Sequence, residues 1–149
     1  MSTKTKEAVL LFEEGYSCAE SVLMACGLDL GLDRDLCQRL ALPFAGGMGG
    51  SGKTCGALTG AMLAIGLHYH STKPDEREER FKTSMAVKQL LSEFSQLHGT
   101  TECAELIGLE INTEQGFASF KKSELRTTHC ARFVKEVAEI VERLSVEDE

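Results

Sequence analysis

Residues 55–69 read CGALTGAMLAIGLHY, and we expect this stretch to form the central helix of the fold. Apolar residues occur on nearly every side of a helix drawn through it, as expected for a helix that neighbouring helices enclose. Gly56 and Gly60 would let a neighbouring helix approach it closely. We therefore predict an all-α fold, a single-domain bundle of about six to seven helices around this central apolar helix.

The segments on either side carry helical spacing as well. Their apolar residues recur at every third or fourth position and do not alternate as they would in strands. Ser17 and Glu20 have the spacing of a capping box, and Asp33 and Asp75 precede further helical runs. The predicted helices span residues 4–14, 18–26, 34–42, 55–69, 75–98, 103–107 and 129–144, with an irregular stretch around Gly116.

Length and charge restrict the class of protein. The chain has 149 residues and a formal net charge of -7, without a basic stripe that could neutralise phosphates, so nucleic acid is not an expected partner. The longest apolar stretch, 57–67, is shorter than the roughly 20 residues that span a bilayer. We expect one domain over residues 1–149 with a frayed acidic tail at 146–149, a cytoplasmic location and no membrane insertion.

The six cysteines are the main candidates for chemistry. Cytoplasmic thiols stay reduced, so these cysteines are reactive, metal-binding or simply buried. Four of them follow a Ser or Thr at a predicted helix start, where free N–H groups and the helix dipole lower a thiol pKa. These four are Cys18, Cys55, Cys103 and Cys130. Cys26 and Cys37 lie within or at the end of predicted helices, and we interpret them as structural.

The residues around the four cysteines carry a recognisable pattern. They read GYSCAESV at 15–22, FAGGMG at 44–49 leading into CGALTGA at 55–61, and CAELIG at 103–108, followed by Cys130. This pattern, which spans nearly the whole chain, resembles the C_GCAxxG_C_C family of redox-active proteins. The family's four hallmark cysteines correspond to Cys18, Cys55, Cys103 and Cys130, so the resemblance implies a redox role for these residues without a defined substrate.

Three kinds of centre are compatible with four converging thiolates. They could cycle between thiol and disulfide, or they could be metal ligands of a tetrahedral zinc or of an iron–sulfur cluster. Haem c is excluded, because the chain has no Cys-x-x-Cys-His sequence. In the disulfide version, we expect Cys55 to be the attacking thiolate, with Lys53 beside it lowering its pKa.

A glycine-rich loop, GGMGGSG at residues 46–52, precedes Cys55. Residues 47–54 also satisfy the P-loop pattern letter for letter, so a nucleotide-binding protein is an alternative. A P-loop follows a buried strand, however, whereas residues 36–44 have helical spacing. The other interpretation is that the loop passes close to the cysteines and binds a cofactor or small anion through Gly46, Gly47, Gly49 and Lys53.

Two further expectations concern partners. A non-enzymatic helical interaction module, whose cysteines serve only in packing, is the third alternative, and it predicts slow thiol labelling and no metal. The apolar helix at 55–69 leaves room for a homodimer. The sequence identifies neither a redox partner nor a small-molecule substrate.

Overall fold

The computed structural model describes residues 1–69 and 75–147, so part of the predicted frayed tail, residues 148 and 149, lies outside the described residues. These residues form eight α-helices and no strand, which confirms the predicted all-α class. None of the helices is both long and apolar enough to cross a membrane. The helices are α1 (Thr3–Glu13), α2 (Cys18–Gly27), α3 (Arg34–Ala41), α4 (Gly56–Tyr69), α5 (Glu76–His98), α6 (Cys103–Ile107), α7 (Glu114–Lys122) and α8 (Ala131–Glu147).

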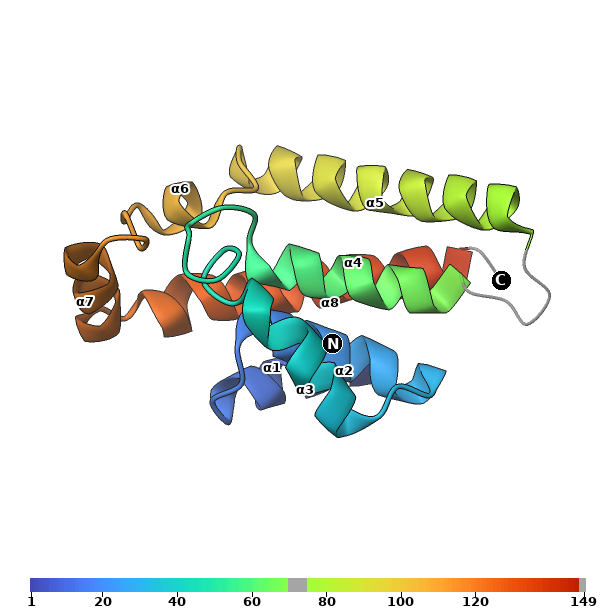
Figure 1. Cartoon of the computed structure of the whole chain (residues 1–149), viewed down its shortest axis with the longest axis horizontal. Helices are drawn as coiled ribbons and strands as arrows, with labels where there is room; N and C mark the ends of the chain where they lie inside the picture. The colour runs from blue at the N-terminus through green and yellow to red at the C-terminus, as the bar shows by residue number, and fades with distance from the viewer. Residues whose placement is uncertain (70–74, 148–149) are drawn as a thin grey trace.

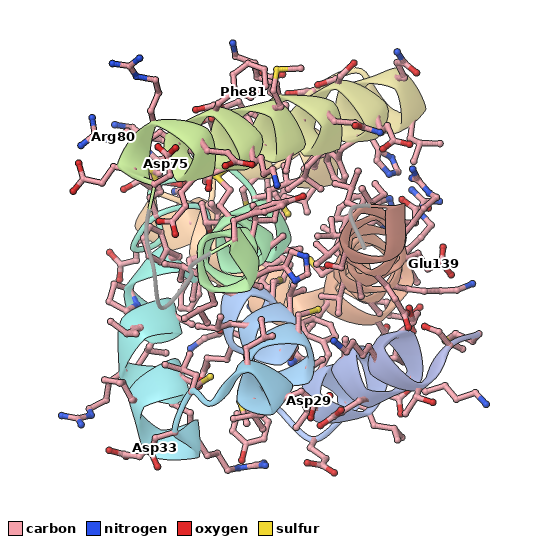
Figure 2. All side chains as sticks on the ribbon, turned by 90° about the vertical axis from the view of Figure 1, so that its right-hand side faces the viewer. Asp29, Asp33, Asp75, Arg80, Phe81 and Glu139 are labelled. Atoms are coloured by element: carbon pink, nitrogen blue, oxygen red, sulfur yellow. The ribbon has the colours of Figure 1, made fainter. Side chains whose placement is uncertain are left out.

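Helix α4 lies at the centre of the bundle, as the sequence predicted. It contacts α2, α5 and α8, and Figure 2 shows it nearly end-on between them. Helix α2 is enclosed to the same extent, because α1, α3, α4 and α8 all pack against it. Charged side chains such as Asp33, Arg80 and Glu139 point outward at the rim (Figure 2). The core is therefore built on two crossing apolar helices, of which the sequence identified one.

Two glycines allow α2 and α4 to cross in backbone contact. A Cβ atom on Gly60 would lie 2.5 Å from the carbonyl oxygen of Ala19, and one on Gly56 would lie 3.4 Å from Cβ of Cys18. At Gly60 only glycine permits an approach this close. The crossing therefore places the first residue of α2, Cys18, against the first turn of α4.

The caps predicted at Ser17, Asp33 and Asp75 are present. Ser17 Oγ accepts from the backbone N–H of Glu20 at 3.2 Å, and Glu20 Oε1 accepts from the N–H of Ser17 at 3.1 Å. Asp33 and Asp75 accept from the first turns of α3 and α5. Because the capping box fixes the start of α2, it also fixes the position of Cys18.

Helix α7 is an element that the sequence-based prediction missed. The stretch around Gly116 was expected to be irregular, but Thr113 Oγ1 accepts from the N–H of Gly116 at 2.9 Å and caps a regular helix. Gly116 packs directly against the carbonyl group of Glu110, where no Cβ fits. The glycine therefore reflects a close approach of backbone and not a break in the helix.

Candidate functional site

All four predicted cysteines line one cavity of about 140 Å³. The cavity lies at the end of the bundle where the glycine-rich loop, α6 and the start of α8 meet (Figure 1). Its wall is mainly apolar, with one cationic residue. The lining residues are Phe12, Ser17, Cys18, Gly46, Gly47, Cys55, Gly56, Cys103, Leu106, Ile107, Ile111, Phe120, Arg126, Cys130 and Phe133.

A short antiparallel pairing brings Cys55 and Cys103 to the cavity. The N–H of Cys55 donates to the carbonyl oxygen of Thr101 at 2.8 Å, and the N–H of Cys103 donates to that of Lys53 at 2.6 Å. Thr54, the residue before Cys55 that we expected to cap the following helix, lies opposite Glu102 within this bridge and is not a cap, and α4 begins directly after Cys55. Helical periodicity carries no signal for such a contact between distant segments.

Cys130 reaches the cavity from a π-helical turn, η3 (Arg126–Cys130), that continues into α8. The helix predicted from about His129 is α8, which begins at Ala131, but the π-helical turn before it means that Cys130 does not lie in a first turn. Thr128 is not a cap, since its hydroxyl donates to the carbonyl oxygen of Glu124 at 2.9 Å. Single π-helical turns are frequent at functional sites, where they redirect a side chain.

The thiols of Cys18 and Cys130 share the cavity, and their interaction moves their pKa values in opposite directions. The interaction with Cys18 lowers the pKa of Cys130, assisted by the charge of Arg126 and opposed by burial. The same interaction, with burial and the other cavity cysteines, raises the pKa of Cys18. The pair therefore favours a thiolate on Cys130 beside a protonated Cys18.

The other two cavity cysteines have raised pKa values. Burial raises the pKa of Cys55 to about 12, although the N–H groups of Ala57 and Leu58 act in the opposite direction. Burial, followed by the charges of Cys130 and Glu102, raises the pKa of Cys103 to about 11. At Cys55 and Cys103 the pKa thus moves in the opposite direction to the one expected for a thiol at a helix start, which argues against Cys55 as the attacking thiolate.

The buried thiols predict a loss of stability at alkaline pH. Burial raises the pKa of Cys26, like that of Cys55, from 9.0 to about 12. Above pH 9 these thiols ionise in the unfolded chain but stay neutral in the folded chain, so stability falls as the pH rises. We expect a loss of about 1.4 kcal/mol per pH unit for each thiol.

This loss can be measured by urea unfolding at pH values below and above 9. The Cys26→Ala variant removes one of the two thiols and should therefore show a shallower decline than the parent chain. Identical declines in both proteins would contradict the contribution of Cys26.

Arg126 is a site residue that the sequence-based prediction missed. Its Nη2 atom donates to the carbonyl oxygens of Phe12 at 2.8 Å and Tyr16 at 2.9 Å, and its guanidinium carbon lies 3.8 Å from the centroid of the Phe12 ring. These contacts tie η3 to the end of α1, just before the residue that caps α2. The only signal in the sequence is its position four residues before Cys130, which places both on one helical face.

Replacing Arg126 with methionine should weaken the Cys130 thiolate. Loss of the positive charge raises the pKa of Cys130, so its alkylation at neutral pH should slow about three- to tenfold. The measurement is the rate of alkylation of Cys130 against pH, followed by peptide mass spectrometry. Arg132→Met is the matched control, because Arg132 is exposed and pairs with Glu136. Equal effects of both substitutions would exclude a specific role for Arg126.

The glycine-rich loop contributes to the cavity only in part. Gly46 and Gly47 line it, and a Cβ on Gly47 would lie 2.6 Å from Cβ of Cys103. The predicted ligands Gly49 and Lys53 are not part of the lining, and Lys53 is exposed. The loop therefore supports Cys103 by close backbone packing, and the predicted ligand set is only half present.

The same loop does not have P-loop geometry. A 3₁₀ turn, Leu42–Phe44, precedes it where a strand would be required, and α4 begins three residues after Lys53. Backbone N–H groups that would cradle phosphate donate within the segment instead, to carbonyl oxygens at residues 44–48. These N–H groups belong to Met48, Gly50, Ser51, Gly52 and Lys53. The nucleotide-binding alternative is therefore not supported.

The described side chains that could bind a metal do not form a ready-made site for a single ion. Within residues 1–69 and 75–147, no group of three or more His, Cys, Asp or Glu side chains is arranged to hold a metal ion. The remaining cysteines, Cys26 and Cys37, are buried in the core and do not line the cavity. A single ion such as zinc would therefore require the four cavity thiols to move closer together.

A family model with the description "Putative redox-active protein (C_GCAxxG_C_C)" matches residues 16–144. The chain belongs to this family. The C_GCAxxG_C_C match includes all four cavity cysteines and confirms the resemblance drawn from the sequence, and with it a redox role. It assigns no metal and no thiol reaction to them.

This C_GCAxxG_C_C protein is similar in sequence to a protein of an archaeon. An "Uncharacterized protein" of Archaeoglobus fulgidus (strain ATCC 49558 / DSM 4304 / JCM 9628 / NBRC 100126 / VC-16) is 32% identical over 109 residues, which cover 68% of this chain and 72% of the relative. No solved structure matches the chain. The chemistry of the site must therefore be argued from its own geometry.

Proposed function

We propose that this protein is a dithiol redox protein whose reactive pair is Cys18 and Cys130. The observation that carries the proposal is that both thiols line one cavity, where each is the largest influence on the pKa of the other. A disulfide between them would close across this cavity. The family's redox role agrees with this chemistry.

The two members of the pair have different roles in the proposed reaction. Cys130 carries the thiolate and attacks the oxidant, because the thiolate is the reactive form. Cys18 keeps its proton until its sulfur attacks the sulfur of Cys130 and closes the disulfide. The oxidation removes two electrons and two protons from the two thiols. Cys55 and Cys103 line the same cavity and stay protonated in this step.

An iron–sulfur cluster is the second candidate, and one observation favours it. Four thiols line a single cavity of about 140 Å³, and four cysteines are the usual ligands of [2Fe–2S] and [4Fe–4S] clusters. A cluster spans more space than one ion, so its four cysteine ligands can lie farther apart than the ligands of a single zinc ion. Cys18, Cys55, Cys103 and Cys130 would hold it, and the cluster would supply one-electron transfer.

Anaerobic purification without chelator separates the two candidates. We expect little iron or sulfide per chain, and we expect one equivalent of diamide to close a single disulfide between Cys18 and Cys130, identified by peptide mass spectrometry. Iron with acid-labile sulfide, retained in Cys26→Ala but lost in Cys55→Ala, would replace the dithiol proposal with the cluster. A protein without metal whose six thiols all resist oxidation would favour the packing-only interaction module.

We also infer that the chain folds as one domain. Helices from both ends of the described chain, α1 and α8, contact each other and pack on the same central helix α2. A cut at any loop would therefore separate parts of one core.

A further inference from the structure

We propose that the oxidant of the Cys18–Cys130 pair is a small, uncharged, single-ring quinone that binds in the cavity beside these thiols. The inference rests on the proposed dithiol function and adds the chemical class of the acceptor. Three features of the cavity carry it, namely its volume, the nature of its wall and the position of its one cation.

The volume limits the ligand to about one ring. The cavity measures about 140 Å³. An apolar cavity of about 150 Å³ in another protein is large enough for benzene. Glutathione disulfide, flavins and dinucleotides are several times larger.

The wall selects an uncharged, planar molecule. Six apolar side chains line it, namely Phe12, Leu106, Ile107, Ile111, Phe120 and Phe133. Three of them are aromatic and can pack against a ring by offset stacking or edge contact. A permanently charged oxidant would lose its hydration on entering, and only one ionised residue other than the cysteines borders the cavity.

That residue, Arg126, is placed to assist a reduced quinone oxygen. Its Nη2 atom is occupied by the carbonyl oxygens of Phe12 and Tyr16, which leaves Nε and Nη1 without a partner among the described residues. Arg126 lines the cavity four residues before Cys130, on the same π-helical turn. A quinone oxygen gains negative charge as the ring is reduced, so a guanidinium beside it stabilises the product.

The reaction balances between the pair and the quinone. The Cys130 thiolate, which has released its proton to water, forms an S–C bond to a ring carbon. The Cys18 sulfur then attacks the Cys130 sulfur, the S–S bond forms and the S–C bond breaks, and its electron pair leaves with the ring. The Cys18 proton passes to one ring oxygen, and water protonates the other. Two thiols become one disulfide and the quinone becomes a hydroquinone.

The test compares two quinones on the reduced full-length protein without oxygen. We expect 1,4-benzoquinone to oxidise the pair at least about tenfold faster than 1,4-naphthoquinone-2-sulfonate, after each rate is divided by that for N-acetylcysteine, because a second ring and a sulfonate do not fit an apolar single-ring cavity. The expected product, by intact mass, is the disulfide without a bound quinone. Leu106→Trp, which fills the cavity, should remove the preference, whereas Leu97→Trp on the exposed face of α5 should keep it.

The outcomes separate this inference from the proposed function. If diamide closes the Cys18–Cys130 disulfide but the two quinones react alike, the quinone inference fails and the dithiol function stands. A stable quinone adduct on Cys130 would also overturn the inference, because the Cys18 step would then be absent. If neither diamide nor quinone forms this disulfide, both proposals fail. Circular dichroism of Leu106→Trp, with Ile111→Phe as a second filled variant, identifies any loss that comes from misfolding.

Discussion

Replacing Cys130 with serine is expected to abolish disulfide formation at the cavity and to remove the fastest-reacting thiol of the protein. In the parent chain, Cys130 is the one cysteine of the described residues whose pKa is lowered, by the interaction with Cys18 and by the charge of Arg126. Without it, the remaining cavity thiols are protonated at neutral pH. The initial rate of thiol alkylation near pH 7 should therefore fall about 100- to 1,000-fold.

The measurement is thiol alkylation followed by stopped flow, with peptide mass spectrometry to assign each modified cysteine. Cys26→Ala is the matched control, since Cys26 is equally free of disulfide but is buried in the core, away from the cavity. Cys18→Ser provides a second arm. It should retain a reactive Cys130, slowed by the loss of the Cys18 thiol, but should form no disulfide. A fast thiol that survives in Cys130→Ser would show that the reactive residue is another cysteine.

The set of cysteines could be predicted from the sequence, but their pairing could not. The capping box at Ser17 and the family motif at Cys55 are local signals, whereas Thr54 and Thr128 precede cysteines of the set without capping a helix. The pairing depends on contacts between distant segments. Gly60 against Ala19 sets the position of α2, and residues 52–55 against 101–104 set the positions of Cys55 and Cys103. The periodicity of one segment does not indicate which distant segment packs against it.

The pKa shifts show the same division between local and tertiary effects. A cysteine at a helix start gains from nearby N–H groups, and Cys55 does receive this contribution from Ala57 and Leu58. Burial outweighs it, because the loss of hydration opposes the thiolate more strongly than two N–H groups favour it. Burial is a property of the whole bundle, so the direction of this shift could not be predicted from residues 54–58 alone.

The second large effect is expected at the crossing of α2 and α4. Gly60→Ala would place a Cβ 2.5 Å from the carbonyl oxygen of Ala19 and 3.0 Å from its Cα. Both are backbone atoms in the middle of the core, so they can make room only if the two helices separate. We expect the free energy of unfolding to fall by about 3 kcal/mol, measured by urea denaturation. The separation should also move Cys18 away from Cys130 and slow closure of their disulfide.

Gly66→Ala on the same helix is the matched control. A Cβ at Gly66 meets no atom within 4 Å, and Gly66 is exposed in the interior of α4. Alanine has the higher helix propensity, so this variant should gain about 0.5–1 kcal/mol of stability. A lower free energy of unfolding for Gly60→Ala, together with a higher one for Gly66→Ala, would show that Gly60 is required for close packing and not for chain flexibility. If Gly60→Ala were as stable as Gly66→Ala, the backbone contact that positions Cys18 would not exist, and the proposed thiol pair would lose its structural basis.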